Sequence, residues 1–106
     1  MPTKYMITWN ERSQGSPADY ETAQSRILDV FGHWKTPESW KIEVFLIRVG
    51  DWGGYMLVET DDLLQVHKLT TALPSFAFEV RPVVPLADAI RVELEAMDWR
   101  ARLKTN

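Results

Sequence analysis

The segment Lys41–Val49, with the sequence KIEVFLIRV, most constrains how this chain can fold. Its β-branched and aromatic residues favour a β-strand. Successive side chains of a strand point to opposite faces, so apolar residues lie on both sides here: Val44 and Leu46 on one, Phe45 and Ile47 on the other. An antiparallel strand with one face in water alternates apolar and polar residues instead. We therefore expect both faces of the sheet containing this strand to be covered.

Six further segments have the patterns of regular secondary structure. Three are predicted strands, because aromatic and β-branched residues are frequent or alternate with polar ones: Lys4–Trp9, Tyr55–Thr60 and Phe76–Val84. Three are predicted helices, because apolar residues recur at helical spacing: Pro17 to a frayed end at 32–35, Asp62 to about Leu73, and about Leu86 to Leu103. Pro82 has no backbone donor, so the last strand is expected at a sheet edge.

Local signals mark where the first two helices begin. Ser16 is the predicted N-cap of the first helix, with Pro17 as its first residue and Asp19 as the acidic partner of a capping box. Asp61 is the predicted N-cap of the second helix. The sequence GDWGG at 50–54 joins two strands, whereas phosphate loops join a strand to a helix N-terminus. Its glycines are therefore expected to serve a hairpin turn.

The order of these elements is strand, helix, strand, strand, helix, strand, followed by one more helix. This order predicts an α+β domain with the ferredoxin-like βαββαβ arrangement, in which two helices cover one face of a four-stranded antiparallel sheet. A chain of 106 residues is expected to form one such domain over residues 1–106.

The helices of one chain cover only one face of this sheet, so the other face needs a second source of cover. We expect a homodimer in which two sheets meet face to face around a two-fold axis. The last helix supports this expectation because it carries two apolar stripes: Leu86, Ile90, Leu94 and Met97, and then Ala89, Val92, Ala96, Trp99 and Leu103. The alternative is that this helix folds under the sheet of its own chain.

Composition excludes several classes of protein. The formal net charge is −3, which argues against nucleic-acid binding because that usually needs a basic face. The third predicted strand also lacks the basic and aromatic pattern of RNA-recognition modules, since Leu57 and Thr60 stand at aromatic positions. The chain has no cysteine, and no apolar run approaches the ~20 residues of a membrane span. We expect a cytoplasmic protein without a nucleic-acid or membrane partner.

Three blocks of the sequence resemble a family of short bacterial proteins known only as a domain of unknown function. They are KYMITW at 4–9, GGYMLVETDD at 53–62 and FAFEVRPVV at 76–84. The hairpin and the last helix are longer than that family's pattern. The resemblance implies membership of the dimeric α/β-barrel superfamily, in which two ferredoxin-like sheets face each other. Its members include cofactor-independent monooxygenases and isomerases, and their pockets usually lie between sheet and helices.

Ionisable candidates for a site are few. His67 is the candidate catalytic residue, because an imidazole suits general acid–base work. Glu59 and Arg81 are candidate ligand-binding residues, and Arg81 would orient an anionic group. Each also has a structural interpretation. His67 would be a half-exposed helical residue, Glu59 would bond to a nearby backbone amide, and Arg81 would join Glu79 in a cross-strand charge arrangement at the dimer surface. The two histidines, His33 and His67, match no metal-ligand spacing, so neither a metal nor another cofactor is expected.

Aromatic side chains supply the other candidate ligand contacts. Tyr5, Trp9, Trp34 and Tyr55 are expected to line a pocket or to fill the core. The sequence therefore supports two hypotheses of different classes. The first is a homodimer that binds a small aromatic or anionic molecule, with oxygenase- or isomerase-like chemistry. The second is a non-catalytic assembly or interaction module. A ligand-sized cavity joined by His67, Glu59 and Trp9 would favour the first.

Overall fold

The structure is a computed structural model, and it describes residues 2–103. Seven elements follow one another along the chain: β1 Thr3–Glu11, α1 Pro17–Gly32, β2 Lys41–Ile47, β3 Gly53–Thr60, α2 Leu63–Ala72, β4 Phe76–Val83 and α3 Leu86–Ala101. The strands form one antiparallel sheet in the order β2-β3-β1-β4. The predicted α+β fold and four-stranded sheet are confirmed, and β4 with Pro82 lies at an edge as expected.

The starts of α1 and α2 follow local chemistry. The Ser16 side chain accepts a bond from the backbone N–H of Asp19, and the Asp19 carboxylate accepts one from the N–H of Ser16. The capping box is therefore confirmed. At α2 the N-cap is Asp62, whose side chain accepts from Gln65 N–H at 3.3 Å, and not Asp61. Thr60 is the reason, because its hydroxyl accepts the N–H of Asp62 and closes the turn one residue later than predicted.

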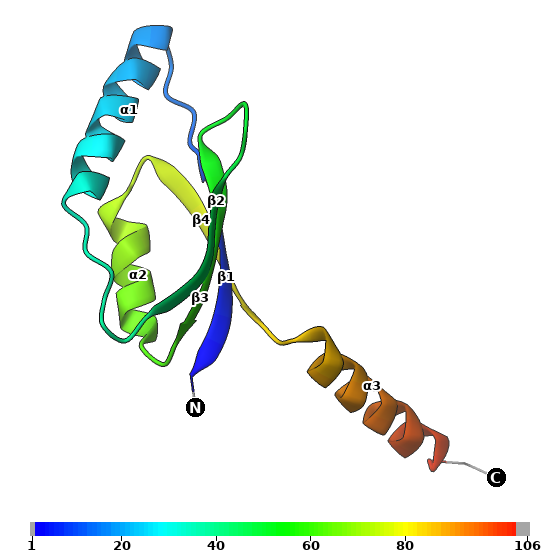
Figure 1. The fold of residues 1–106 in the computed structure, drawn as a ribbon. Coiled ribbons are helices and arrows are strands. Elements are labelled where there is room, and N and C mark those ends of the chain that lie inside the picture. Colours follow the sequence, from blue (N-terminus) through cyan, green and yellow to red (C-terminus); the bar gives the residue numbers. More distant parts are fainter. Residues whose placement is uncertain (1, 104–106) are drawn as a thin grey trace.

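Helices α1 and α2 lie on one side of the sheet, as Figure 1 shows. The core forms between them and the sheet, around Ile7 and Trp9 of β1, Met56 and Val58 of β3, and Val66 of α2. These strand residues share one face because the register pairs Ile7 with Met56 and Trp9 with Gly54. An irregularity between Ile42 and Val44 of β2 then places Phe45, opposite Met56, on this same face.

The sheet together with α1 and α2 forms the body of the molecule. Neither α1 nor α2 lies over the other face of the sheet, which we call the helix-free face (Figure 1). Apolar side chains form a band across β1, β2 and β3 on this face: Met6, Val44, Leu46, Tyr55 and Leu57. The exposed fractions are 59% for Leu46, 40% for Tyr55 and 37% for Val44. We expected both faces of β2 to be covered. The helices cover one face, whereas on the other face the apolar band is exposed.

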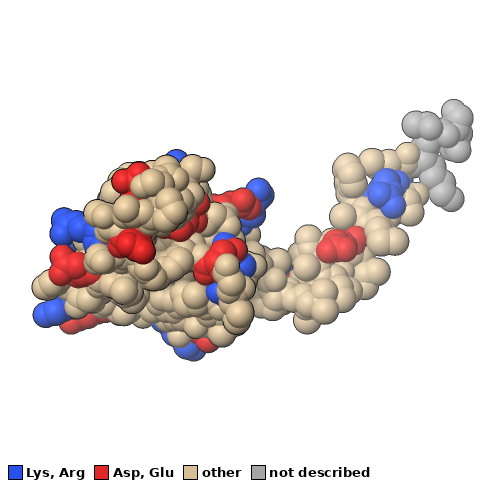
Figure 2. Space-filling view, turned by 90° about the horizontal axis from the view of Figure 1, so that it is seen from above, with Lys and Arg blue, Asp and Glu red and all other residues tan. Residues whose placement is uncertain are grey.

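Helix α3 lies apart from this body. It extends from the end of β4 on the side of the sheet opposite to α1 and α2 (Figure 1), and the molecule is therefore 68 Å long but only 32 by 22 Å across. None of the residues Leu86–Ala101 is buried. Figure 2 shows α3 protruding from a body whose charges are scattered. No helix within residues 2–103 is long and apolar enough to cross a bilayer.

Candidate functional site

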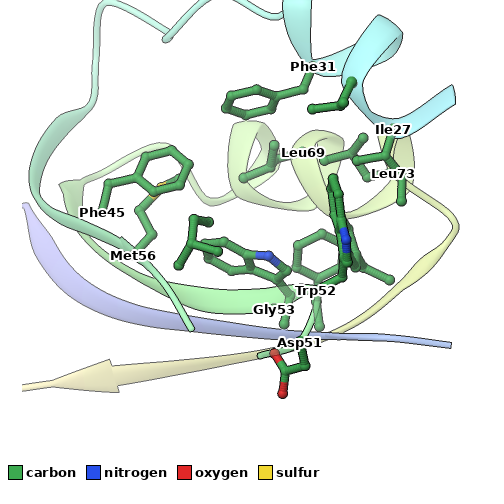
Figure 3. Close-up of a pocket in the computed structure, with 14 residues that line it drawn as sticks. Ile27, Phe31, Phe45, Asp51, Trp52, Gly53, Met56, Leu69 and Leu73 are labelled. Atoms are coloured by element: carbon green, nitrogen blue, oxygen red, sulfur yellow. The ribbon is translucent and has the colours of Figure 1, made fainter. Parts of the chain in front are cut away.

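A cavity of about 430 Å³ lies between the sheet and the two helices that cover it (Figure 3). We call it the core cavity. Fourteen described residues line it: Trp9, Ile27, Leu28, Phe31, Phe45, Ile47, Asp51, Trp52, Gly53, Met56, Leu69, Leu73, Phe76 and Phe78. All but Asp51 and Gly53 have apolar or aromatic side chains. The lining is therefore suited to an apolar molecule, because it offers almost no polar partner.

Aromatic rings form the sheet side and one wall of the core cavity. The ring of Trp9 meets that of Phe45 edge-on, with centroids 5.7 Å apart and planes at 86°. Phe45 also meets Phe31 of α1 at 5.9 Å and 80°. Trp9 lies 6.4 Å from Phe78 of β4. The first two pairs are edge-to-face, which is a favoured geometry for aromatic rings, so each of these rings helps to fix the orientation of the next.

The outer side of the core cavity is open to solvent between α1 and β2. Leu28 on α1 and Ile47 at the end of β2 both line the cavity, yet they are 59% and 61% exposed. Phe45 is 38% exposed and lies between the buried rings and the surface. A molecule entering from solvent would therefore pass Leu28 and Ile47 before it reaches Trp9.

Two glycines of β3 make room for the residues around them. A Cβ on Gly54 would lie 2.8 Å from Cζ2 of Trp9 and would also collide with the carbonyl oxygen of Leu46. A Cβ on Gly53 would collide with the guanidinium of Arg48 and with the backbone of Trp9. The expectation that these glycines serve the turn is therefore wrong for Gly53 and Gly54, which lie in the strand. Gly50, with φ +96°, does serve the turn.

Arg48, in the β2–β3 hairpin, forms hydrogen bonds to β1 and within the hairpin. Its Nε donates to both carboxylate oxygens of Asp51, at 3.1 and 3.2 Å. Its Nη2 donates to the carbonyl oxygen of Trp9 at 3.1 Å and to Oδ1 of Asn10 at 2.6 Å. The bond to Asp51, followed by that to Tyr55, raises the pKa of Arg48 above its ordinary value. The hairpin that carries Trp52 is thus held against the strand that carries Trp9.

Asp51 is the one ionisable side chain among the described lining residues, and it is not free to act in the cavity. Its carboxylate is bound by Arg48. In Figure 3 it points away from the ring cluster formed by Trp52 and its neighbours. General acid–base catalysis needs an ionisable group within hydrogen-bond reach of the substrate. The geometry of the core cavity therefore favours binding over proton transfer.

The structure brings only one predicted aromatic residue, Trp9, into the lining of the core cavity. Trp34 lies beyond the cavity, stacked on Phe31 with centroids 5.5 Å apart. Tyr5 shares the helix-covered face with Trp9 but lies outside the lining. Tyr55 pairs with Thr8, so it points to the helix-free face, where the Arg48 guanidinium lies 5.4 Å from its ring centroid. Tyr5, Trp9 and Tyr55 therefore form no common wall.

The predicted ionisable site residues also lie away from the cavity. Glu59 is on the helix-free face, where its carboxylate lies 3.4 Å from Nζ of Lys4. Glu43 binds the same ammonium at 2.8 Å, which raises the pKa of Lys4 and lowers that of Glu43. Arg81 pairs with Glu79 along its own strand. Glu79 and Arg81 thus form a charge arrangement, but within one strand and not across two. Glu59 pairs with the Lys4 ammonium and not in the way that its structural interpretation named.

His67 is exposed on α2, and it is absent from the lining of the core cavity. Its backbone carbonyl accepts the hydroxyls of Thr70 and Thr71, both at 2.8 Å. The anticipated convergence of His67, Glu59 and Trp9 on one cavity does not occur. Within residues 2–103, no group of three or more His, Cys, Asp or Glu side chains is placed to hold a metal ion.

Of the six aromatic lining residues, sequence reasoning named only Trp9 as a candidate ligand contact and missed Phe31, Phe45, Trp52, Phe76 and Phe78. The four phenylalanines have the ordinary apolar pattern of helix and strand residues, which does not distinguish a cavity wall from a packed core. Only Trp52, flanked by glycines in a hairpin, carried a signal of its own, since a large aromatic in a short turn needs apolar surface to contact. The hairpin folds this ring over the helix-covered face of the sheet, where it lines the cavity.

Comparison with known proteins gives a family without a function. Residues 3–97 match the family described as "Domain of unknown function (DUF3303)". This match spans all four strands, the two helices of the body and most of α3. No curated protein matches the chain.

Proposed function

The chain belongs to the DUF3303 family, a domain of unknown function, and from that premise we propose that it binds a small, mainly apolar molecule in the core cavity. One observation carries the proposal: about 430 Å³ of space lined by aromatic and aliphatic side chains, open to solvent past Leu28 and Ile47. Small-molecule sites commonly have volumes of ~300–1,000 Å³ and mainly apolar linings. A flat aromatic or alicyclic ligand fits this chemistry best.

Oxygenase- or isomerase-like chemistry stays a prediction. It would need a base, and Asp51 is the only ionisable candidate among the described lining residues. To act, Asp51 would first have to leave Arg48 and turn toward the ligand. The bond at 3.1 Å opposes that movement, which is why binding, and not catalysis, is the function proposed here.

Calorimetric titration with 1-naphthol as a neutral aromatic probe tests the proposal. The unchanged protein is expected to bind one probe per chain with a Kd of about 10 µM to 1 mM, the range that a ligand of this size reaches. Leu28→Trp, which puts a larger ring at the mouth, is expected to weaken binding at least tenfold. The matched control is Leu64→Trp on α2, at a position 80% exposed and outside the cavity lining, which should leave Kd unchanged.

Two results would contradict the proposal. One is the absence of saturable binding up to the solubility limit of the probe. The other is an equal loss of affinity in Leu28→Trp and Leu64→Trp, because the probe would then bind elsewhere on the surface.

We also propose that the protein forms a homodimer that buries the helix-free face, and that assembly is its second role. Leu46, Val44 and Tyr55 support this, because they form an exposed apolar band on a sheet. Leu46→Glu is expected to shift the mass measured by light scattering from two chains to one. Leu64→Glu, on the other side of the sheet, is the control and should remain a dimer. A monomer for the unchanged protein at all accessible concentrations would refute the assembly.

A further inference from the structure

Helix α3 has two apolar stripes, and within the described residues none of the side chains in either stripe is buried. The first stripe consists of Leu86, Ile90, Leu94 and Met97. The second consists of Val92 and Trp99, and Leu103 continues it just beyond the end of the helix. At 100° per residue, the two stripes point roughly 155° apart around the helix. Every one of these side chains is between 46% and 76% exposed. A helix that is apolar on two sides needs two packing neighbours, and the body of its own chain supplies neither.

One of the two arcs of α3 between the stripes carries five charged side chains that pair with one another. Arg91 lies between Asp88 and Glu95, at 3.9 and 3.5 Å from their carboxylates, and Arg102 binds Asp98 at 2.8 Å. These five residues form one charged strip along the helix. Because their charges are satisfied within the helix, the strip needs no partner, and the two stripes on either side of it remain to be covered.

The connection to β4 carries α3 away from its own sheet. Only Val84 and Pro85 separate Val83, the last residue of β4, from Leu86. Pro85 has φ −60° and ψ 147°, and a residue before proline is held in an extended conformation. The chain therefore runs straight off the sheet edge before the helix begins. Short, stiff connections of this kind favour exchange of the following element between copies, because the element cannot easily fold back.

We propose that α3 is an exchanged arm: its first stripe docks on the helix-free face of a second copy, and its second stripe docks on that copy's α3. The inference rests on the homodimer proposed above and specifies what covers each face. Two-fold symmetry supplies both neighbours at once, since the second copy brings a sheet face for one stripe and an identical helix for the other.

The dimensions of the two surfaces agree with this docking. A helix of 16 residues is about 24 Å long, and strands of seven to nine residues are about 23–30 Å long. The apolar band of Leu46, Val44 and Leu57 lies on the side of the sheet toward which α3 extends (Figure 1). One helix of the second copy can therefore cover this band along the whole length of the strands.

The charges on the helix-free face agree with a second copy as the occupant. Lys4 is paired with Glu43 and Glu59, and Arg81 is paired with Glu79. Lys41 lies opposite Glu59 in the register of β2 and β3, so the face carries three basic and three acidic side chains. Acids and bases thus neutralise each other within the chain, and the face has no large patch of one sign. A strongly charged partner would find no complement here, whereas a mainly apolar helix stripe meets an apolar band with paired charges at its rim.

Disulfide trapping tests the exchange, and the natural chain, which has no cysteine, gives a clean background. The double variant Leu94→Cys with Leu46→Cys is first weighed by native mass spectrometry when reduced, and is then oxidised and weighed again under denaturing conditions. Exchange predicts a reduced dimer that becomes covalently linked on oxidation. It also predicts a linked heterodimer in a mixture of chains that carry L94C alone and L46C alone. Glu95→Cys, on the charged strip, replaces L94C in the control and is expected to lower the yield at least fivefold.

Each alternative outcome separates the exchange from the dimer. Oxidation to a single chain with an internal disulfide would overturn the exchange, because α3 would then fold on its own sheet. A reduced dimer that forms no link would overturn the exchange while leaving the proposed dimer in place. A reduced monomer would overturn both.

Discussion

At the scale of single residues, space around β3 decides which side chains are tolerated. Gly54 lies opposite Trp9, against the backbone of β2, and Gly53 lies under Arg48. Neither position has a positive φ, so the requirement is for room and not for an unusual backbone conformation. Trp9 and the guanidinium of Arg48 can lie so close to β3 only because two consecutive residues of that strand have no side chain.

Gly54→Ala is expected to lower the free energy of unfolding by about 1–3 kcal/mol, because the added methyl group forces Trp9 and β2 to move. Urea denaturation followed by circular dichroism measures the change. Gly32→Ala is the matched control: no heavy atom lies within 4 Å of its added Cβ, and it ends a helix. That substitution should be neutral or stabilising by up to about 1 kcal/mol. Equal losses in both variants would show that crowding at Gly54 is not the cause.

The ion pair of Lys4 and Glu43 predicts how the stability of the protein changes at acidic pH. Its hydrogen bond lowers the pKa of Glu43 in the folded protein, so the folded state binds the proton less readily than the unfolded chain does. The contribution is therefore present above the ordinary glutamate range and lost as pH falls from about 5 to about 3. Lys4→Met is expected to flatten the dependence of stability on pH in this window, measured by urea denaturation at several pH values. Lys35→Met, at an exposed position between α1 and β2, is the control and should leave it unchanged.

At the scale of the elements, the capping box of α1 was predictable because it depends on four consecutive residues. Ser16→Ala removes the acceptor for Asp19 N–H and is expected to cost about 1 kcal/mol. Ser25→Ala, at an exposed position inside α1, should change stability by less than about 0.5 kcal/mol or raise it slightly. Thermal unfolding of both variants, side by side, makes the comparison. A Ser16→Ala variant as stable as Ser25→Ala would mean that the cap contributes nothing.

The strand order and both helices of the body were also predictable, since each has its own periodicity and the order admits few sheets. The candidate site was harder to predict from the sequence than the fold. Side chains alternate between the two faces of a strand, so the register between strands decides which residues share a face. Tyr55 pairs with Thr8 and therefore lies on the face opposite to that of Trp9. The sequence of one strand does not contain this register, so it cannot predict which aromatic side chains meet on one face. The position of Trp52 over the cavity depends in the same way on how the whole hairpin folds.

At the scale of the whole molecule, the body and α3 differ in how they are stabilised. The body has a buried core around Ile7, Met56 and Val66, whereas α3 has none of its own. If two copies supply each other's missing neighbours, folding and association are linked, and stability depends on protein concentration. The melting temperature of the unchanged protein should then rise with concentration. Leu46→Glu should melt at the same temperature throughout, and a flat curve for both would contradict the linkage.

An isolated helix of 16 residues is marginal in water, and α3 buries no residue in its own body. If α3 is exchanged as proposed, a chain without its partner copy would expose the peptide bonds of α3 to a protease more than those of the buried core. Trypsin would find Arg91, Arg100 and Arg102 there. On the proposed exchange, the helix that completes the dimer would make an unassembled chain sensitive to degradation. The ratio of trimmed to intact chains would then measure the fraction of copies without a partner.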